Sequence, residues 1–204
     1  MRVYESLKRT KHELKLTFKI EKIEGHKGNN CIKVEGVHEY TIANESEKEI
    51  PYRSEIYTDI GPYLLYDTDG KRGGFKSVQV NGEDKTPERI SKSKELFLDV
   101  SPIPSKGNLH FKYHTYAYYR LVDRLIWTVQ ESSDPFTVEI INATGFHKNE
   151  LLFWYNHDDR QMMDSRGLKR LGANNEYYVI EFSSPVQPYQ GFEIFWNFEE
   201  AYFL

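Results

Sequence analysis

The chain has 204 residues, a formal net charge of −4 at pH 7 and one cysteine, Cys31. This length fits one sizeable domain or two small β domains, the lone cysteine excludes an intrachain disulfide, and the acidic balance argues against a general nucleic-acid binder. Aromatic residues make up 15% of the chain, which favours β-strands around a full core. No stretch has the ~20 apolar residues of a membrane helix, and the start has no apolar signal region, so we expect a cytoplasmic protein.

The first part of the chain predicts a short helix followed by long strands. Residues 2–11 place Val3 and Leu7 on one side of a helix, so we expect 1–12 to be a helical lead-in or linker and 13–204 to be a single β domain. Apolar residues then alternate with charged ones, first at Leu14, Leu16, Phe18 and Ile20, and after a turn at Ile32, Val34, His38, Tyr40 and Ile42. This alternation is typical of half-buried strands, and Gly36 predicts a bulge in the second one.

The rest of the chain continues the β pattern. Further strands are predicted over 50–60, 63–66, 75–80, 96–100, 109–120, 125–129, 136–141, 151–155, 177–182 and 192–198, and 159–171 predicts one helical insertion. About ten short strands separated by turn residues predict an antiparallel β-sandwich or barrel. We expect Val138, Ile140, Trp196 and Phe198 to be buried together with the apolar residues of the first strand.

Asn44 and Asn142 each begin an N-x-S/T sequence, and we interpret both asparagines as turn residues.

The stretch Leu109–Arg120 is the main candidate for a binding surface. Read as a strand, it places Leu109, Phe111, Tyr113, Thr115, Ala117 and Tyr119 on one face and His110, Lys112, His114, Tyr116, Tyr118 and Arg120 on the other. Tyrosine rings stack on planar ligands, and lysine and arginine neutralise phosphate or carboxylate groups. The predicted ligand-binding residues are Lys112, His114, Tyr116, Tyr118 and Arg120, with Arg124 at the rim. A solvent-facing strand surface is the alternative.

Other motifs favour structural roles. Gly70–Ser77 resembles a phosphate-binding loop but has Phe75 where that motif needs glycine, and a strand follows. His110 and His114 lie roughly 13 Å apart along a strand, too far to share a metal ion. The sequence has no G-x-S-x-G motif, and nothing near Cys31 would activate its thiol. We therefore expect no metal and no cofactor, and an enzyme is the less favoured interpretation.

The sequence predicts a non-enzymatic recognition or sensor domain for a small anionic, nucleotide-like ligand, within a larger cytoplasmic system that includes a partner protein or an upstream effector domain. A local site on an acidic chain favours a small ligand over nucleic acid; stacking on single-stranded bases is the weaker variant. The alternative is a protein-interaction or structural β module. A third hypothesis is a hydrolase or lyase that uses His157, Asp158 and Asp159.

Overall fold

A computed structural model describes residues 9–24, 30–57, 73–85, 95–129, 131–145, 150–156, 168–171, 177–188 and 190–198. Every regular element in these ranges is a strand, as predicted. The strands are β1 (Arg9–Glu24), β2 (Asn30–Asn44), β3 (Ile50–Tyr57), β4 (Gly73–Val80), β5 (Glu83–Asp84), β6 (Glu95–Ile103), β7 (Asn108–Tyr119), β8 (Val122–Thr128), β9 (Phe136–Ala143), β10 (Glu150–Asn156), β11 (Leu168–Leu171), β12 (Tyr177–Phe182) and β13 (Gly191–Asn197).

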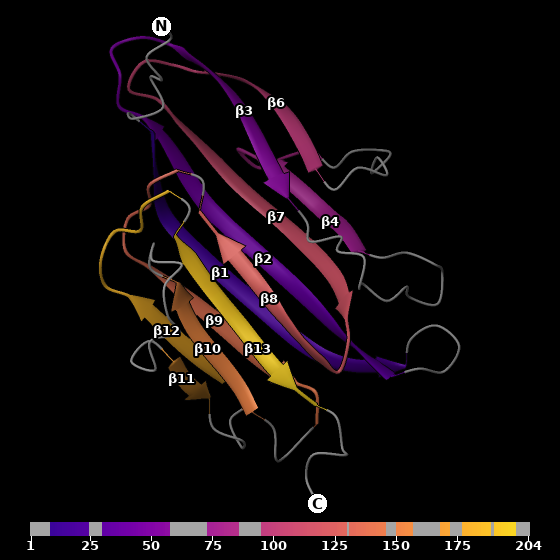
Figure 1. Cartoon of the computed structure of the whole chain (residues 1–204). Helices are drawn as coiled ribbons and strands as arrows, with labels where there is room; N and C mark the ends of the chain where they lie inside the picture. Colours follow the sequence, from indigo (N-terminus) through magenta and orange to yellow (C-terminus); the bar gives the residue numbers. More distant parts are fainter. Residues whose placement is uncertain are drawn as a thin grey trace, which may run out of the picture.

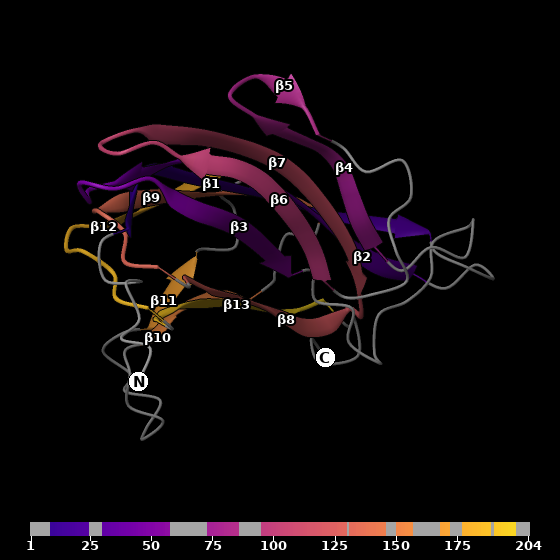
Figure 2. The same cartoon turned by 90° about the horizontal axis from the view of Figure 1, so that it is seen from above.

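The strands form three sheets (Figure 1). The large sheet has seven strands in the order β12-β9-β1-β2-β7-β4-β5, and the small sheet has four in the order β11-β10-β13-β8. β3 and β6 pair as a separate ribbon of two strands. The large sheet arches over the small sheet and the ribbon, which lie on its concave side (Figure 2). The described strands do not close into a barrel. Of the two predicted architectures, the β-sandwich is therefore closer to the structure than the barrel.

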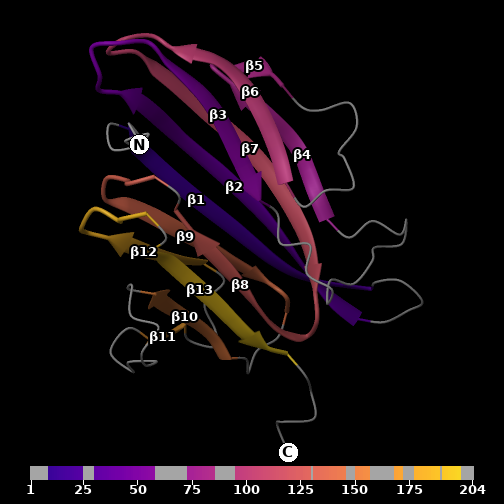
Figure 3. The ribbon, with the colours of Figure 1, turned by 45° about the horizontal axis from the view of Figure 1, so that its top comes forward.

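The large sheet is mixed, which corrects the prediction of a purely antiparallel fold. β1 pairs antiparallel with β2 but parallel with β9, where Leu16 lies opposite Val138. A parallel neighbour needs a long connection, and about a hundred residues separate β1 from β9. Figure 3 shows β9 and β12 continuing the sheet beyond β1. Sequence periodicity does not report which strands pair, so this arrangement was not predictable from alternation.

Two predicted helices are not found in the described residues. β1 begins at Arg9, so residues 9–11 are strand, and residues 2–8 lie outside the described part. A short isolated helix is marginal in water, whereas Lys11 gains hydrogen bonds from the sheet and from the neighbouring 132–134 segment. Residues 168–171 form β11, which pairs with β10, and 159–167 lie outside the described residues.

The core lies between the large sheet and its two covers. All eight side chains predicted to be buried are buried: Leu14, Leu16, Phe18, Ile20, Val138, Ile140, Trp196 and Phe198. They belong to one apolar cluster that also includes Ile50 and Ile103 at the ends of the ribbon strands. Gly36 forms no bulge. A Cβ there would come within 2.8 Å of Thr115 Oγ1 and 2.9 Å of His38 Nε2, so glycine leaves room for these two side chains.

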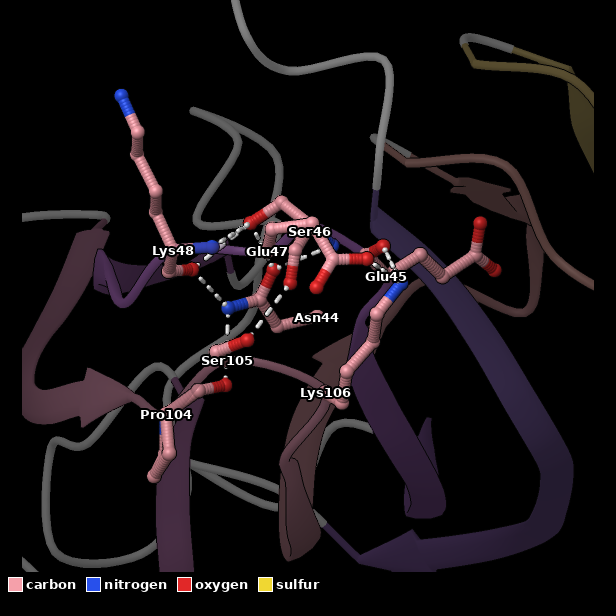
Figure 4. Close-up of polar contacts among 8 residues, drawn as sticks. All are labelled: Asn44, Glu45, Ser46, Glu47, Lys48, Pro104, Ser105 and Lys106. Carbon is pink, nitrogen blue, oxygen red and sulfur yellow. Dashed lines mark hydrogen bonds and ion pairs between the residues drawn. The ribbon is translucent and has the colours of Figure 1, made fainter.

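Asn44 joins the turn after β2 to the turn before β7 (Figure 4). Its Nδ2 donates to the carbonyl oxygens of Lys48 at 2.8 Å, Pro104 at 2.9 Å and Ile103 at 3.1 Å. Its Oδ1 accepts from Ser46 N at 3.0 Å and from Ser46 Oγ at 2.6 Å. Asn44 is buried, and Asn142 accepts from Thr144 in the same way; both asparagines lie at the ends of strands rather than in turns, and their side chains bond to the residues that follow.

Candidate functional site

The predicted binding residues of β7 lie on the outer face, which we define as the side of the large sheet turned away from the small sheet. Phe18 on the inner side lies 5.9 Å from Phe192 of β13, measured between ring centroids. Side chains alternate along each strand, and of the β7 residues predicted to face inward, Leu109, Phe111, Tyr113 and Tyr119 are buried, whereas Thr115 and Ala117 are partly buried. His110, Lys112, His114 and Tyr116 are therefore on the outer face, where they are partly exposed.

Glutamates of β2 neutralise the cations of the outer face. Glu39 lies opposite Lys112 and accepts from its Nζ at 2.9 Å, and His110 Nε2 is 3.3 Å from the same carboxylate. The hydrogen bond from Lys112 lowers the pKa of Glu39 below its usual value, although desolvation opposes the shift. Glu35 likewise pairs with Lys33 and, at 2.5 Å, with Lys76 of β4. Sequence analysis missed both glutamates because only the register between the two strands brings them beside the row.

The other predicted site residues differ from these in burial and position. Tyr118 is buried, and its ring meets that of Tyr116 edge-on at 5.9 Å. Arg120 is exposed just after β7, where its carbonyl accepts from Trp196 Nε1 at 3.0 Å. Arg124 belongs to β8 of the small sheet, and its Nη1 lies 3.2 Å from Glu193 Oε2. The six residues are therefore divided between two sheets, and that they bind one ligand stays a prediction.

The residues of the third hypothesis, His157, Asp158 and Asp159, lie outside the described residues, as do Lys71 and Arg72 of the glycine loop. Within the described ranges, no three His, Cys, Asp or Glu side chains are grouped so that they could hold a metal ion. Cys31 is buried, and burial raises the pKa of its thiol. In the part of the chain that the structure describes, no helix has the length and hydropathy to cross a membrane.

A polar cluster lies on the inner side of the large sheet. His38 is buried there, as the alternation predicts, and its ring stacks on Tyr113 at 4.5 Å. Lys11 Nζ lies 3.1 Å from Glu131 Oε2 and 4.6 Å from the centre of the Tyr40 ring. Burial lowers the pKa of His38 to about 3, helped by the positive charge of Lys11. His38 is thus a neutral core imidazole at physiological pH, and its Nδ1 has no hydrogen-bond partner in the described structure.

Comparisons with known proteins show similarity in fold only. No protein-family model matches the chain, and no curated protein matches its sequence. Among solved structures, the M1 zinc metallopeptidase from Deinococcus radiodurans has a TM-score of 0.50 at 9% identity, covering 92% of this chain and 42% of the peptidase chain. A protein from Legionella pneumophila that is provisionally described as nutrient-binding has a TM-score of 0.45 at 13% identity, covering 90% of this chain and 66% of that one. The second likeness is too weak to carry an argument.

The residues of this chain do not fit a metallopeptidase zinc site. The sequence contains no H-E-x-x-H, in which two histidines bind zinc and the glutamate acts as base. The described residues hold no three-ligand group either. The chain is a β domain that resembles part of a longer peptidase chain, and the likeness gives no reason to assign it peptidase chemistry.

Proposed function

We propose that this domain is a non-catalytic recognition module that binds another protein. The supporting observation is the position of its exposed apolar side chains. In the described part of the chain, the exposed large apolar residues are Val122 and Ile126 on β8 and Tyr177 and Val179 on β12. β8 ends the small sheet and β12 ends the large one. Apolar side chains gathered on edge strands are typical of surfaces that contact another polypeptide.

The outer face gives little support to a small anionic ligand. Lys112 and His110 already share Glu39, and Lys76 and Lys33 share Glu35, so an anion would meet cations whose charge is partly neutralised. The described structure gives no support to the nucleotide or sensor part of the sequence prediction. The likeness to 42% of a longer peptidase chain fits a domain that acts beside other domains.

The experiment is crosslinking in cells followed by quantitative purification of the wild-type chain and of two edge variants. One variant carries Val122→Lys and Ile126→Lys, and the other carries Tyr177→Lys and Val179→Lys. Gln79→Lys, on an exposed position of β4, is the control. We expect one protein to be recovered in stoichiometric amount with wild type and control and to be lost with at least one edge variant. Equal recovery with all four folded proteins would refute the proposal.

The second candidate is the small anionic ligand predicted for Lys112, His114, Tyr116, Tyr118, Arg120 and Arg124. It is favoured by the partial exposure of His114 and Tyr116 on one row. A thermal-shift screen of nucleotides and sugar phosphates tests it, because a ligand that binds the folded state raises the melting temperature. A stabilising compound should lose its effect in Lys112→Ala and keep it in Lys106→Ala. A screen without any shift contradicts this candidate.

A further inference from the structure

One side of β8 has no described strand beside it. The backbone N–H and C=O groups on that side are positioned to pair with another strand. Just beyond the ends of the β8–β13 ladder, Val129 N donates to Gln190 O at 2.9 Å and Phe198 N donates to Leu121 O at 2.8 Å. Successive residues of an antiparallel strand turn their N–H and C=O groups to opposite sides. The odd-numbered residues of β8 therefore bond to β13. The even-numbered residues turn their backbone groups to the other side, where no described strand pairs with them: Val122, Arg124, Ile126 and Thr128.

Within the described part of the chain, only one of these outward amides has a hydrogen-bond partner. Arg124 N donates to Asp123 Oδ1 at 2.9 Å, and the other oxygen of Asp123 accepts from Arg120 N at 3.3 Å. Asp123 thus protects one position of the edge, as charged groups do on natural edge strands. The amides of Val122, Ile126 and Thr128 are directed outward with no partner among the described residues; Val122 and Ile126 are four residues apart along the strand, and Ile126 and Thr128 are two apart.

The side chains along this edge are apolar and incompletely covered. Val122 is 42% exposed and Ile126 is 43% exposed on the side away from the core. On the opposite side of the strand, Leu125 and Trp127 pack against the core but are only partly buried. A strand added here would cover apolar surface on both sides of β8, which favours an extended polypeptide over a polar small molecule.

Arg124 stands between the two exposed apolar residues. Its Nη1 is 3.2 Å from Glu193 Oε2, and its guanidinium carbon lies 5.8 Å from the Phe195 ring centre. The Arg124 side chain is half exposed, whereas that of Glu193 is only 9% exposed. A guanidinium carries five N–H donors, so a second carboxylate can bind beside Glu193. The edge therefore presents the order apolar, cationic, apolar.

We propose that β8 is a strand-addition site for an extended segment of a partner protein in which an acidic residue alternates with apolar ones. The acidic side chain faces Arg124, and the flanking apolar side chains face Val122 and Ile126. Main-chain hydrogen bonds to the edge supply affinity, and the alternate side chains supply specificity. This inference rests on the proposed function, because it identifies one edge and the chemistry of its partner.

The probe is an acetylated and amidated heptapeptide, Lys-Val-Leu-Glu-Leu-Val-Lys. In antiparallel register with glutamate opposite Arg124, its valines lie opposite Val122 and Ile126. Amide hydrogen exchange by NMR is the readout. We expect the peptide to slow exchange at Val122, Ile126 and Thr128 at least tenfold. Unchanged exchange at these three amides at millimolar peptide would overturn the inference.

N-methylation of the peptide separates strand addition from general hydrophobic contact. Methyl groups on the valine and glutamate nitrogens, which point at β8 in this register, should weaken binding at least tenfold. Methyl groups on the two leucine nitrogens, which point away, should leave it within about twofold. Equal effects of the two patterns would contradict strand pairing.

Matched variants locate the site and separate this inference from the proposed function. Ile126→Lys should abolish peptide binding, whereas Val179→Lys, the same kind of change on an exposed residue of β12, should not. If neither variant changes binding, the β8 site is wrong. If the peptide does not slow amide exchange but an edge variant still loses the crosslinked partner, this inference is wrong and the proposed function stands. The alternative outcome is that sedimentation shows a dimer whose β8 amides are protected from exchange without peptide. In that case a second copy of this chain pairs with β8, and the proposal of a different partner protein is overturned.

Discussion

The outer face of the large sheet and the free edge of β8 differ in what remains unsatisfied. On the outer face, the cations of β7 meet glutamates of the adjacent strand, as Lys112 meets Glu39 at 2.9 Å. On the edge, one cation meets one glutamate, but no described strand lies beside the backbone amides of Val122, Ile126 and Thr128. The outer face has the residue types of a binding site, whereas the edge of β8 has backbone amides without a hydrogen-bond partner among the described residues.

This difference shows that side-chain composition alone is a poor indicator of a binding surface. Exposed ion pairs contribute little to stability and are weakened by salt, so the outer face can carry many charges as a soluble surface. Backbone groups of an edge strand favour pairing with another chain unless they are blocked. Four substitutions, one beside the edge and three in or beneath the outer face, test this comparison below in order of decreasing effect.

Gly191→Ala should have the largest effect because it acts on the strand pair that supports the edge. A Cβ at Gly191 would lie 1.9 Å from the carbonyl oxygen of Trp127, so β13 and β8 could not keep their pairing. We expect a loss of about 4 kcal/mol or more in the free energy of unfolding, measured by urea denaturation. Gly36→Ala is the control on the large sheet: its Cβ would meet only side-chain atoms, at 2.8 Å or more, so a cost of about 1–3 kcal/mol is expected. Equal costs would contradict the register of β13 and β8.

Asn44→Ala tests the frame that holds the ends of β2 and β7, on which the outer face is built. The change removes the amide that links the carbonyls of Lys48, Ile103 and Pro104. Buried polar groups left without partners cost about 1–3 kcal/mol each, so we expect a total loss of about 2–4 kcal/mol in urea denaturation. Lys106→Ala, which removes an exposed ion pair with Glu47 in the same junction, should cost less than about 1 kcal/mol.

His38→Phe tests the core directly beneath the outer face through its pH dependence. Burial lowers the pKa of His38 from 6.5 to about 3, so the unfolded chain takes up a proton between these pH values and the folded chain does not. This histidine should therefore reduce stability by about 1.4 kcal/mol per pH unit as the pH falls from 6.5 towards 3. The phenylalanine variant should show a shallower decline over that window. Parallel curves for the two proteins would mean that the imidazole is accessible.

Glu39→Gln should have the smallest effect. The substitution removes the charge that Lys112 and His110 share, but the pairs are partly exposed, so we expect less than about 1 kcal/mol at neutral pH. The lowered pKa of Glu39 means that its contribution is present above pH ~4.3 and is lost as the pH falls through the folded-state pKa. The same substitution should increase any binding of small anions to Lys112, and unchanged anion binding would argue against a ligand on this face.

Alternation along single strands determined much of the fold and its core. The period of two residues at Leu14, Leu16, Phe18 and Ile20 predicted their burial, and the same pattern placed Tyr113 inward and Lys112 outward. Such patterns are local, because every second side chain of a strand shares a face whatever its neighbours are. The prediction of an N-terminal helix failed at residues 9–11 because pairing with β2 outweighed a weak helical pattern.

Only the tertiary structure decided which strands are neighbours, and the neighbours decide what each surface can do. Glu39 and Lys112 are 73 residues apart in the chain and become partners through the β2–β7 register. Arg124 was predicted to lie at the rim of the β7 row, and pairing with β13 places its strand, β8, at the end of another sheet. Hydrogen-bond partners across strands depend on contacts distant in sequence. The alternation in β8 therefore marks its exposed side chains but cannot show that no described strand pairs with one of its edges.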